Sequence, residues 1–298
     1  MARIRSGILT FLIALAASPV PVEGQNQVAT PTEEFQALAK QFNAEGFALR
    51  QATTDEERLA VAERASKLTL ALLDLAEKNP QEPVALDALV QVVLQEIWLE
   101  NNTPHRSFGK DSPEVRAIAV LVRDHIRSDK IADATRRVQY GFRPECETFL
   151  RAVLEKNPHR EIQGLACLRL GQFLNARLQR LDVLKEQPEM TRRYEGLFGR
   201  DYLAALKGRD RAEARREVEA IFERAAKEFG EVNLPYGGLT VGEKAQSELY
   251  EIRHLAVGQQ APQIEGEDQD GKPLALSDYR AKGDYRGKVV LLYFWSEY

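Results

Sequence analysis

Apolar residues recur at a spacing of three or four along most of the chain, from Thr30 to about Leu255. This is the spacing of one face of an α-helix, and runs of alternating or β-branched residues, which would indicate strands, are few in this region. The pattern predicts a mainly α fold for residues 30–255. One face of each helix is expected to pack against a neighbouring helix.

Start and stop signals place three helices in the first half of this region. Thr54 followed by Glu57 is a capping box, and Pro80 ends the helix that this box begins. A second helix follows Pro83. A third begins near Pro113, because proline in the first turn gives up an N–H that has no helical partner.

Two stretches of the chain share one layout, residues 72–92 and residues 149–171. Each consists of an apolar helix, a Glu-Lys-Asn-Pro turn and a second apolar helix, and the turns fall at 77–80 and 155–158. Residues 220–230 resemble the first half of a more degenerate unit. Helical hairpins of this kind bury their apolar faces by stacking, so the sequence predicts an α-solenoid. The units resemble tetratricopeptide-like hairpins, although their spacing is irregular.

The N-terminus has the layout of a secretory signal peptide. Arg3 and Arg5 precede an apolar run, and small residues and prolines continue to Gly24. The run is shorter than the roughly twenty residues that span a bilayer. We expect residues 1–24 to be removed, with cleavage near Ala17 or Gly24. The protein is then exported to the periplasm or cell envelope, and it contacts the membrane only if the segment stays attached.

The charged residues are balanced, with a formal net charge of −4. Arginine pairs at 136–137, 192–193 and 215–216 are interleaved with glutamates and form no basic stripe. Nucleic acid is therefore not an expected partner. These charges are predicted to cover exposed helix faces.

The pattern changes after Gly258. Asp270-Gly271 lies between two short extended segments and predicts a tight hairpin, because glycine accepts the positive φ that such turns require. Residues 289–295 are seven consecutive apolar residues, Val-Val-Leu-Leu-Tyr-Phe-Trp. This is the pattern of a strand buried on both faces of a sheet.

Three motifs occur in order in this C-terminal segment, at residues 257–264, 270–280 and 286–295. Together they resemble the beginning of the redoxins, a thioredoxin-fold group that includes alkyl hydroperoxide reductase/thiol-specific antioxidant proteins and exported thiol-disulfide oxidoreductases. The resemblance implies that residues 257–298 are the first, incomplete part of an α/β thioredoxin-like domain. It also implies that the full-length protein exchanges disulfides or reduces peroxides together with a redox partner protein.

In that family a reactive cysteine follows the buried strand at the start of a helix, where the helix dipole favours the thiolate. Aligning Phe294-Trp295 with the family pattern puts the first such cysteine one position beyond Tyr298. The resemblance therefore implies that this chain lacks the catalytic residues and is inactive as an oxidoreductase. The alternative is that the helical region is the functional part, a protein- or peptide-binding scaffold with a vestigial redoxin segment.

The chain has two cysteines, Cys146 and Cys167. Both fall on apolar helix faces, and Glu145 and Glu147 flank Cys146, so negative charge is expected to disfavour its thiolate. We expect two buried structural thiols. A disulfide between them remains open, because an oxidising compartment permits one.

Other motifs add no chemistry. The four histidines are scattered and none has the spacing of a zinc-binding helix. Residues 266–271 echo a calcium loop only weakly, and Ser277 occupies the position where that loop requires Glu. The sequence contains no glycine-rich phosphate loop and no serine nucleophile elbow. It therefore predicts no catalytic, metal-binding or cofactor-binding residues.

Overall fold

The computed structural model describes residues 29–103, 112–267, 270–281, 288–289 and 291. This part of the chain is mainly helical, as the apolar spacing predicted. The expected signal segment, residues 1–24, lies outside the described residues. No helix within the described ranges is long and apolar enough to cross a membrane.

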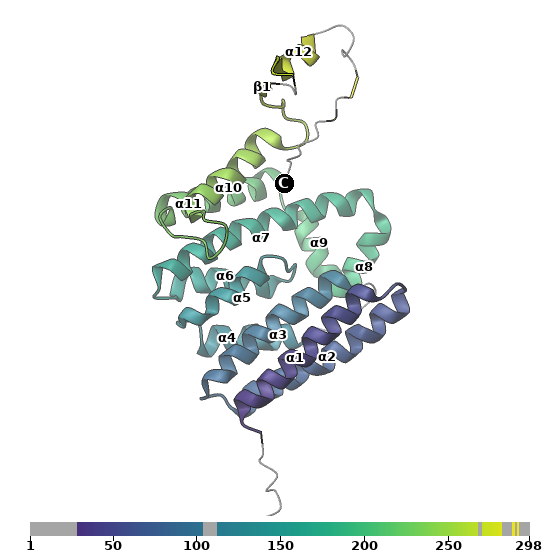
Figure 1. Cartoon of the computed structure of the whole chain (residues 1–298), viewed down its shortest axis with the longest axis vertical. Coiled ribbons are helices and arrows are strands. Elements are labelled where there is room, and N and C mark those ends of the chain that lie inside the picture. Colours follow the sequence, from purple (N-terminus) through teal and green to yellow (C-terminus); the bar gives the residue numbers. More distant parts are fainter. Residues whose placement is uncertain (1–28, 104–111, 268–269, 282–287, 290, 292–298) are drawn as a thin grey trace, which may run out of the picture.

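The helices follow one another along the long axis of the molecule (Figure 1), with α1, α2 and α3 at one end and α10 and α11 towards the other. The first four helices are α1 (Pro31–Gln51), α2 (Asp55–Lys78), α3 (Pro83–Asn102) and α4 (Pro113–Asp124), followed by the 3-10 turn η1 (Asp129–Ile131) and α5 (Ala132–Val138). They continue with α6 (Pro144–Lys156), α7 (Arg160–Glu186), α8 (Pro188–Phe198), α9 (Arg200–Gly208), α10 (Arg211–Phe229), α11 (Val241–Tyr250) and the π-helical turn η2 (Glu251–Leu255).

Consecutive helices pack on one another: α1 on α2, α2 on α3, α3 on α4, and α6 on α7. The long helix α7 also contacts α5, α10 and α11, and it thereby joins the two halves of the stack. Helix α5 packs on both α3 and α7. Because of these contacts, one face of the molecule carries residues from α1, α3, α5 and α7.

The predicted helix starts are confirmed. Thr54 accepts a hydrogen bond from the backbone N–H of Glu57 at 3.2 Å, and the Glu57 carboxylate accepts one from the backbone N–H of Thr54 at 3.2 Å. Pro113 is the first residue of α4. These are local contacts, and short sequence spacings identify them.

Both Glu-Lys-Asn-Pro sequences lie at a turn between two helices, the first between α2 and α3 and the second between α6 and α7. The Asn79 amide donates to the carbonyl of Leu75 at 2.8 Å. The buried Asn157 amide donates to the carbonyls of Ile126 at 2.8 Å and Ser128 at 2.9 Å. The asparagine thus satisfies main-chain carbonyls in both copies. Residues 220–230 fall almost wholly within α10.

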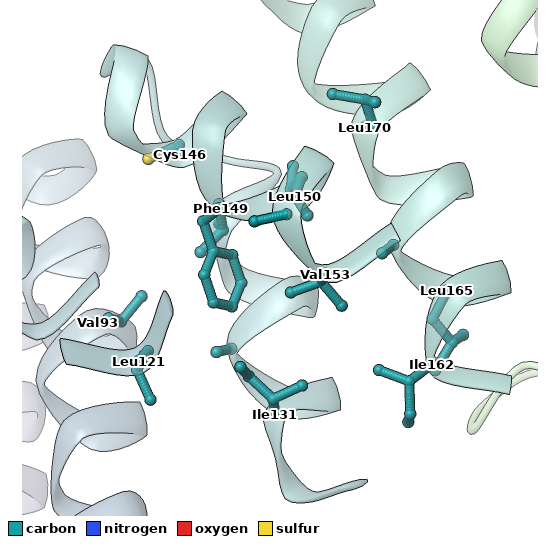
Figure 2. Packing of buried hydrophobic residues seen from close by; sticks show 14 of the residues in the cluster. Val93, Leu121, Ile131, Cys146, Phe149, Leu150, Val153, Ile162, Leu165 and Leu170 are labelled. Atoms are coloured by element: carbon teal, nitrogen blue, oxygen red, sulfur yellow. The ribbon is translucent and has the colours of Figure 1, made fainter. Parts of the chain in front are cut away.

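The largest core cluster extends from α2 to η2. Figure 2 shows its centre, where Phe149 and Val153 of α6 lie between Leu121 of α4 and Ile162 of α7. Cys146 belongs to this core, as does Cys167, and neither side chain is exposed. The prediction of two buried thiols is confirmed, and both are free rather than joined in a disulfide.

The C-terminal segment contains β1 (Glu265–Glu267), β2 (Pro273–Ala275) and α12 (Leu276–Ala281). The two strands pair antiparallel, and Gly271 in the turn has φ of 73°. The hairpin predicted at Asp270-Gly271 is therefore confirmed, and its turn needs the positive φ that glycine tolerates.

The predicted buried strand at 289–295 is described only at Val289 and Leu291, where the prediction is wrong. Neither residue lies in a strand, and their side chains are 99% and 88% exposed. A strand buried on both faces needs neighbouring strands and covering helices. In the described part of the segment, the only sheet is a pair of three-residue strands that are themselves largely exposed. The rest of residues 289–295 lies outside the described residues.

Candidate functional site: an arginine-lined groove

Two adjoining cavities open on the face formed by α1, α3, α5 and α7. One has a volume of about 450 Å³ and lies between α3, α5 and α7, and the other has a volume of about 360 Å³ and lies between α1, α3 and α5. Trp98 and Arg137 line both cavities. We call the pair the arginine groove. Its lining residues are Phe42, Asn43, Gly46, Arg50, Gln91, Leu94, Gln95, Trp98, Asn102, Arg136, Arg137, Gln139, Tyr140, Arg169 and Arg180.

Four half-buried arginines surround the larger cavity. Arg136 and Arg137 come from the end of α5, and Arg169 and Arg180 come from α7, on which α5 packs. None of the described residues that line the groove is Asp or Glu. The groove is therefore positively charged, although the chain as a whole carries a formal charge of −4.

Three of these arginines contact other groups of the protein. Arg169 donates from Nη1 to Gln139 at 3.3 Å and to Gln172 at 2.7 Å, and Arg180 donates to the carbonyl of Tyr140 at 2.9 Å. Arg136 approaches a carboxylate oxygen of Asp133 only to 4.0 Å, and its buried Nε has no hydrogen-bond partner.

Arg137 is the least satisfied of the four. Within the part of the chain that the structure describes, its guanidinium makes neither a hydrogen bond nor an ion pair. Burial lowers the pKa of Arg137, and the neighbouring Arg136 lowers it further. Burial also lowers the pKa of Arg169. Arginine nevertheless stays protonated at neutral pH, so these are partly desolvated cations with donors to spare.

The smaller cavity adds aromatic and amide groups. Trp98 packs edge-on against Phe42 with ring centroids 5.8 Å apart. Gln95 is only 2% exposed, and neither its side-chain oxygen nor its nitrogen has a hydrogen-bond partner. A buried amide without partners costs about 1–3 kcal/mol per group. Both atoms are covered by the protein, so Gln95 forms part of the wall of the smaller cavity.

A further cavity of about 410 Å³ lies between α7, α10 and η2. There, charged side chains are paired with groups of the protein itself. Arg211 donates to the carboxylate of Asp182, and Arg215 donates to the carbonyl of Ile252. The arginine groove differs because the Arg137 guanidinium and the Gln95 amide make no hydrogen bond among the described residues.

Close to the groove, a buried ionic cluster joins α3, α4 and the start of α6. Arg143 Nε lies 3.7 Å from a carboxylate oxygen of Glu100 and 3.4 Å from one of Glu114. The Cys146 thiol donates to the other oxygen of Glu114 at 3.3 Å. None of these four residues is more than 5% exposed. We call them the Glu100–Glu114 cluster.

Two carboxylates in this cluster share one guanidinium away from water. Burial raises the pKa of Glu100 to about 7 despite the opposing charge of Arg143. Burial raises the pKa of Glu114 to about 8, and the charge of Glu100 adds to this rise. Arg180 of the groove acts on Glu100 in the opposite direction. The cluster therefore holds a proton near neutral pH, and it is electrostatically linked to the groove.

Neither cysteine thiol is readily deprotonated. Burial raises the pKa of Cys146 well above the usual thiol value, and Glu114 and Glu100 raise it further. Burial raises the pKa of Cys167 to about 12. The sequence predicted that negative charge would disfavour the Cys146 thiolate, and the structure agrees. The carboxylates that act are Glu114 and Glu100 rather than the flanking Glu145 and Glu147.

The prediction that the arginine pairs cover exposed helix faces is wrong for Arg137, whereas the Arg136 side chain is 43% exposed. Both are half-buried and face residues of α3 and α7 that lie far away in the sequence. No spacing rule relates Arg137 to Arg169 or Trp98, which is why the sequence predicted no site residues here. The one local signal is the aromatic Tyr140, which follows the arginine pair closely and lines the same cavity.

Among the described residues, no group of three or more His, Cys, Asp or Glu side chains is placed to hold a metal ion. No protein-family model, no curated protein and no solved structure matches the chain.

Proposed function

We propose that residues 30–255 form a helical-repeat module, a solenoid of helical hairpins, which binds a polypeptide segment of a partner protein in the arginine groove. The observation that carries this proposal is the unused hydrogen-bonding capacity of the groove walls. The Arg137 guanidinium and both amide atoms of Gln95 have no partner among the described residues. Buried polar groups are normally paired, so unpaired groups that line one cavity favour a ligand.

The other walls of the groove suit a polypeptide. Trp98 is half-buried and Tyr140 is 53% exposed, and aromatic residues with one polar edge commonly anchor bound peptides. The groove extends across four helices, from α1 through α3 and α5 to α7. An elongated ligand fits such a surface better than a compact metabolite.

Blocking the groove tests this proposal. A Cβ added to Gly46 would meet only Trp98, at 3.8 Å, so the backbone there has room for a side chain, and Gly46→Leu is chosen to occupy the smaller cavity. Gly196→Leu is the matched control, because nothing lies within 4 Å of a Cβ at that position. On an array of random-sequence peptides, we expect the wild type and Gly196→Leu to bind a common set of peptides and Gly46→Leu to lose that binding. Equal binding by all three proteins would contradict the proposal.

A second candidate function is thiol-disulfide or peroxide chemistry by a redoxin domain that begins at residue 257. The β1–β2 hairpin with its turn at Gly271 supports this candidate, because it lies where the redoxin motifs predict one. The helical module would then hold the redox partner of an exported oxidoreductase. Cys146 and Cys167 would take no part, since both are buried and burial raises the pKa of each.

The coding sequence that follows the codon of Tyr298 tests the redoxin candidate. An in-frame Cys-x-x-Cys, or a single early cysteine, supports it, and a stop codon there contradicts it. For the 298-residue chain itself we expect no turnover in an insulin-reduction assay.

A further inference from the structure

The larger cavity of the arginine groove has a chemical preference of its own. Arg136, Arg137, Arg169 and Arg180 line a volume of about 450 Å³, and none of the described lining residues carries a carboxylate. Asp133 lies 4.0 Å from Arg136, and the carboxylate of Glu248 is already held by Lys244 at 3.0 Å and Gln172 at 2.8 Å. Glu100 of the buried cluster acts on Arg180, but burial raises the pKa of Glu100 to about 7. The cavity therefore keeps an excess of positive charge.

The geometry of the arginine N–H donors also favours a particular ligand. Each guanidinium presents five N–H groups in a plane and pairs with a carboxylate through two parallel hydrogen bonds. Arg137 makes no hydrogen bond within the described part of the chain, and Arg169 donates only from Nη1. These free donors are an observation independent of the charge, and both point to an anionic ligand.

We infer that the larger cavity binds carboxylate groups, and that the segment recognised by the groove is acidic. This inference deepens the proposed function and rests on it. The acidic side chains occupy the cavity lined by Arg136, Arg137, Arg169 and Arg180. The main chain then continues past Trp98 into the smaller cavity.

A nucleic acid fits these observations less well. Phosphate backbones are usually bound along a basic stripe, whereas the excess positive charge here is confined to one cavity of a chain whose net charge is −4. An acidic protein segment needs only a local cluster of guanidiniums. Charge complementarity therefore favours the acidic peptide, and an oligonucleotide serves as a rival probe.

The test uses a short fluorescein-labelled peptide of alternating Glu and Ser, amidated at its C-terminus, and a counterpart with Gln in place of Glu. Fluorescence anisotropy measures the Kd of each peptide for the wild type. Arg137→Gln removes one guanidinium and leaves no other described group without its hydrogen-bond partner. Arg127→Gln is the matched control, because Arg127 is exposed between α4 and η1 and does not line the groove.

We expect Arg137→Gln to raise the Kd of the Glu peptide about tenfold to a hundredfold, which corresponds to the usual contribution of a hydrogen bond to a charged group. Arg137→Lys should lose less affinity for the Glu peptide, since lysine keeps the positive charge but cannot form two parallel hydrogen bonds with a carboxylate. Arg127→Gln should change the Kd less than about twofold, in keeping with small long-range effects between exposed charges. The Gln peptide should bind more weakly than the Glu peptide and should not discriminate between wild type and Arg137→Gln.

Different negative results would contradict the peptide-binding function and the acidic preference. Suppose that both peptides bind equally, that Arg137→Gln has no effect and that Gly46→Leu raises the Kd of both. The groove then binds peptides, and the acidic preference is wrong. If neither peptide binds at low ionic strength, the proposed function fails with it. If a free-acid form of the Gln peptide binds as tightly as the amidated Glu peptide, the terminal carboxylate is the bound group. Tighter binding of an oligothymidylate that Arg137→Gln abolishes would replace the acidic peptide with a nucleic acid.

Discussion

Replacing Glu114 with glutamine should make the protein more stable at alkaline pH. Glu114 is fully buried beside Glu100, and one guanidinium, that of Arg143, lies near both carboxylates. The amide introduced by Glu114→Gln would have nearly the shape of the protonated acid, and its oxygen would still accept the hydrogen bond from the Cys146 thiol. The variant therefore resembles the cluster in its protonated state at every pH.

The direction follows from the raised pKa values. A folded state that binds a proton more tightly than the unfolded chain is stabilised at low pH, and it loses that stability as pH rises through the folded pKa. Here the window runs from the ordinary value of 4.5 to about 7 for Glu100 and about 8 for Glu114. Because a tenfold change in proton affinity is worth about 1.4 kcal/mol, the loss between pH 5 and pH 8 is on the order of 3 kcal/mol for each of the two carboxyl groups.

Urea unfolding followed by far-UV circular dichroism at pH 5 and pH 8 measures this loss. The wild type should be less stable at pH 8, whereas Glu114→Gln should change less between the two pH values and exceed the wild type at pH 8. Glu63→Gln, an exposed carboxyl on α2, should follow the wild type at both pH values. A Glu114→Gln protein that is less stable than the wild type at pH 8 would show that the charged carboxylate is a net stabilising partner of Arg143, and would refute the reasoning.

Three further outcomes are expected. Thr54→Ala should lower the free energy of unfolding by about 1 kcal/mol in urea denaturation, because it removes the side-chain cap of α2. Gly171→Ala should lower the Tm, since a Cβ there would lie 2.7 Å from the buried Phe222 ring and overpacking costs about 1–3 kcal/mol, more than the roughly 1 kcal/mol gained in helix propensity. Gly196→Ala, with open space around it, should raise the Tm instead. Both cysteines should resist a thiol reagent in the native protein and react in urea, because both are buried; rapid native reaction would contradict the packing.

Helix ends were predictable from the sequence because they depend on neighbouring residues. Thr54 and Glu57 are three positions apart, and Pro113 acts on its own helix turn. The Asp270-Gly271 turn is equally local. In each case the spacing of two or three residues carries the physical cause, so no knowledge of the fold is needed.

The groove and the ionic cluster could not be predicted in the same way. Cys146 and Glu114 are 32 positions apart and meet only because α6 packs on α4. Arg137 and Arg180 meet only because α5 packs on α7. A charged residue in a helix is usually exposed, so the sequence gives no reason to expect a buried Glu114 or a half-buried Arg137 until the helices are placed.

Hydrogen–deuterium exchange tests the central claim, that the arginine groove is the binding surface, most directly. The 298-residue chain is compared with and without the amidated Glu-Ser peptide. We predict added protection in α3 and α5, which supply Gln95, Trp98, Arg136 and Arg137, and unchanged exchange in α4, which does not line the groove. Protection confined to α10 and α11, or no protection at peptide concentrations that saturate the anisotropy signal, would contradict the claim.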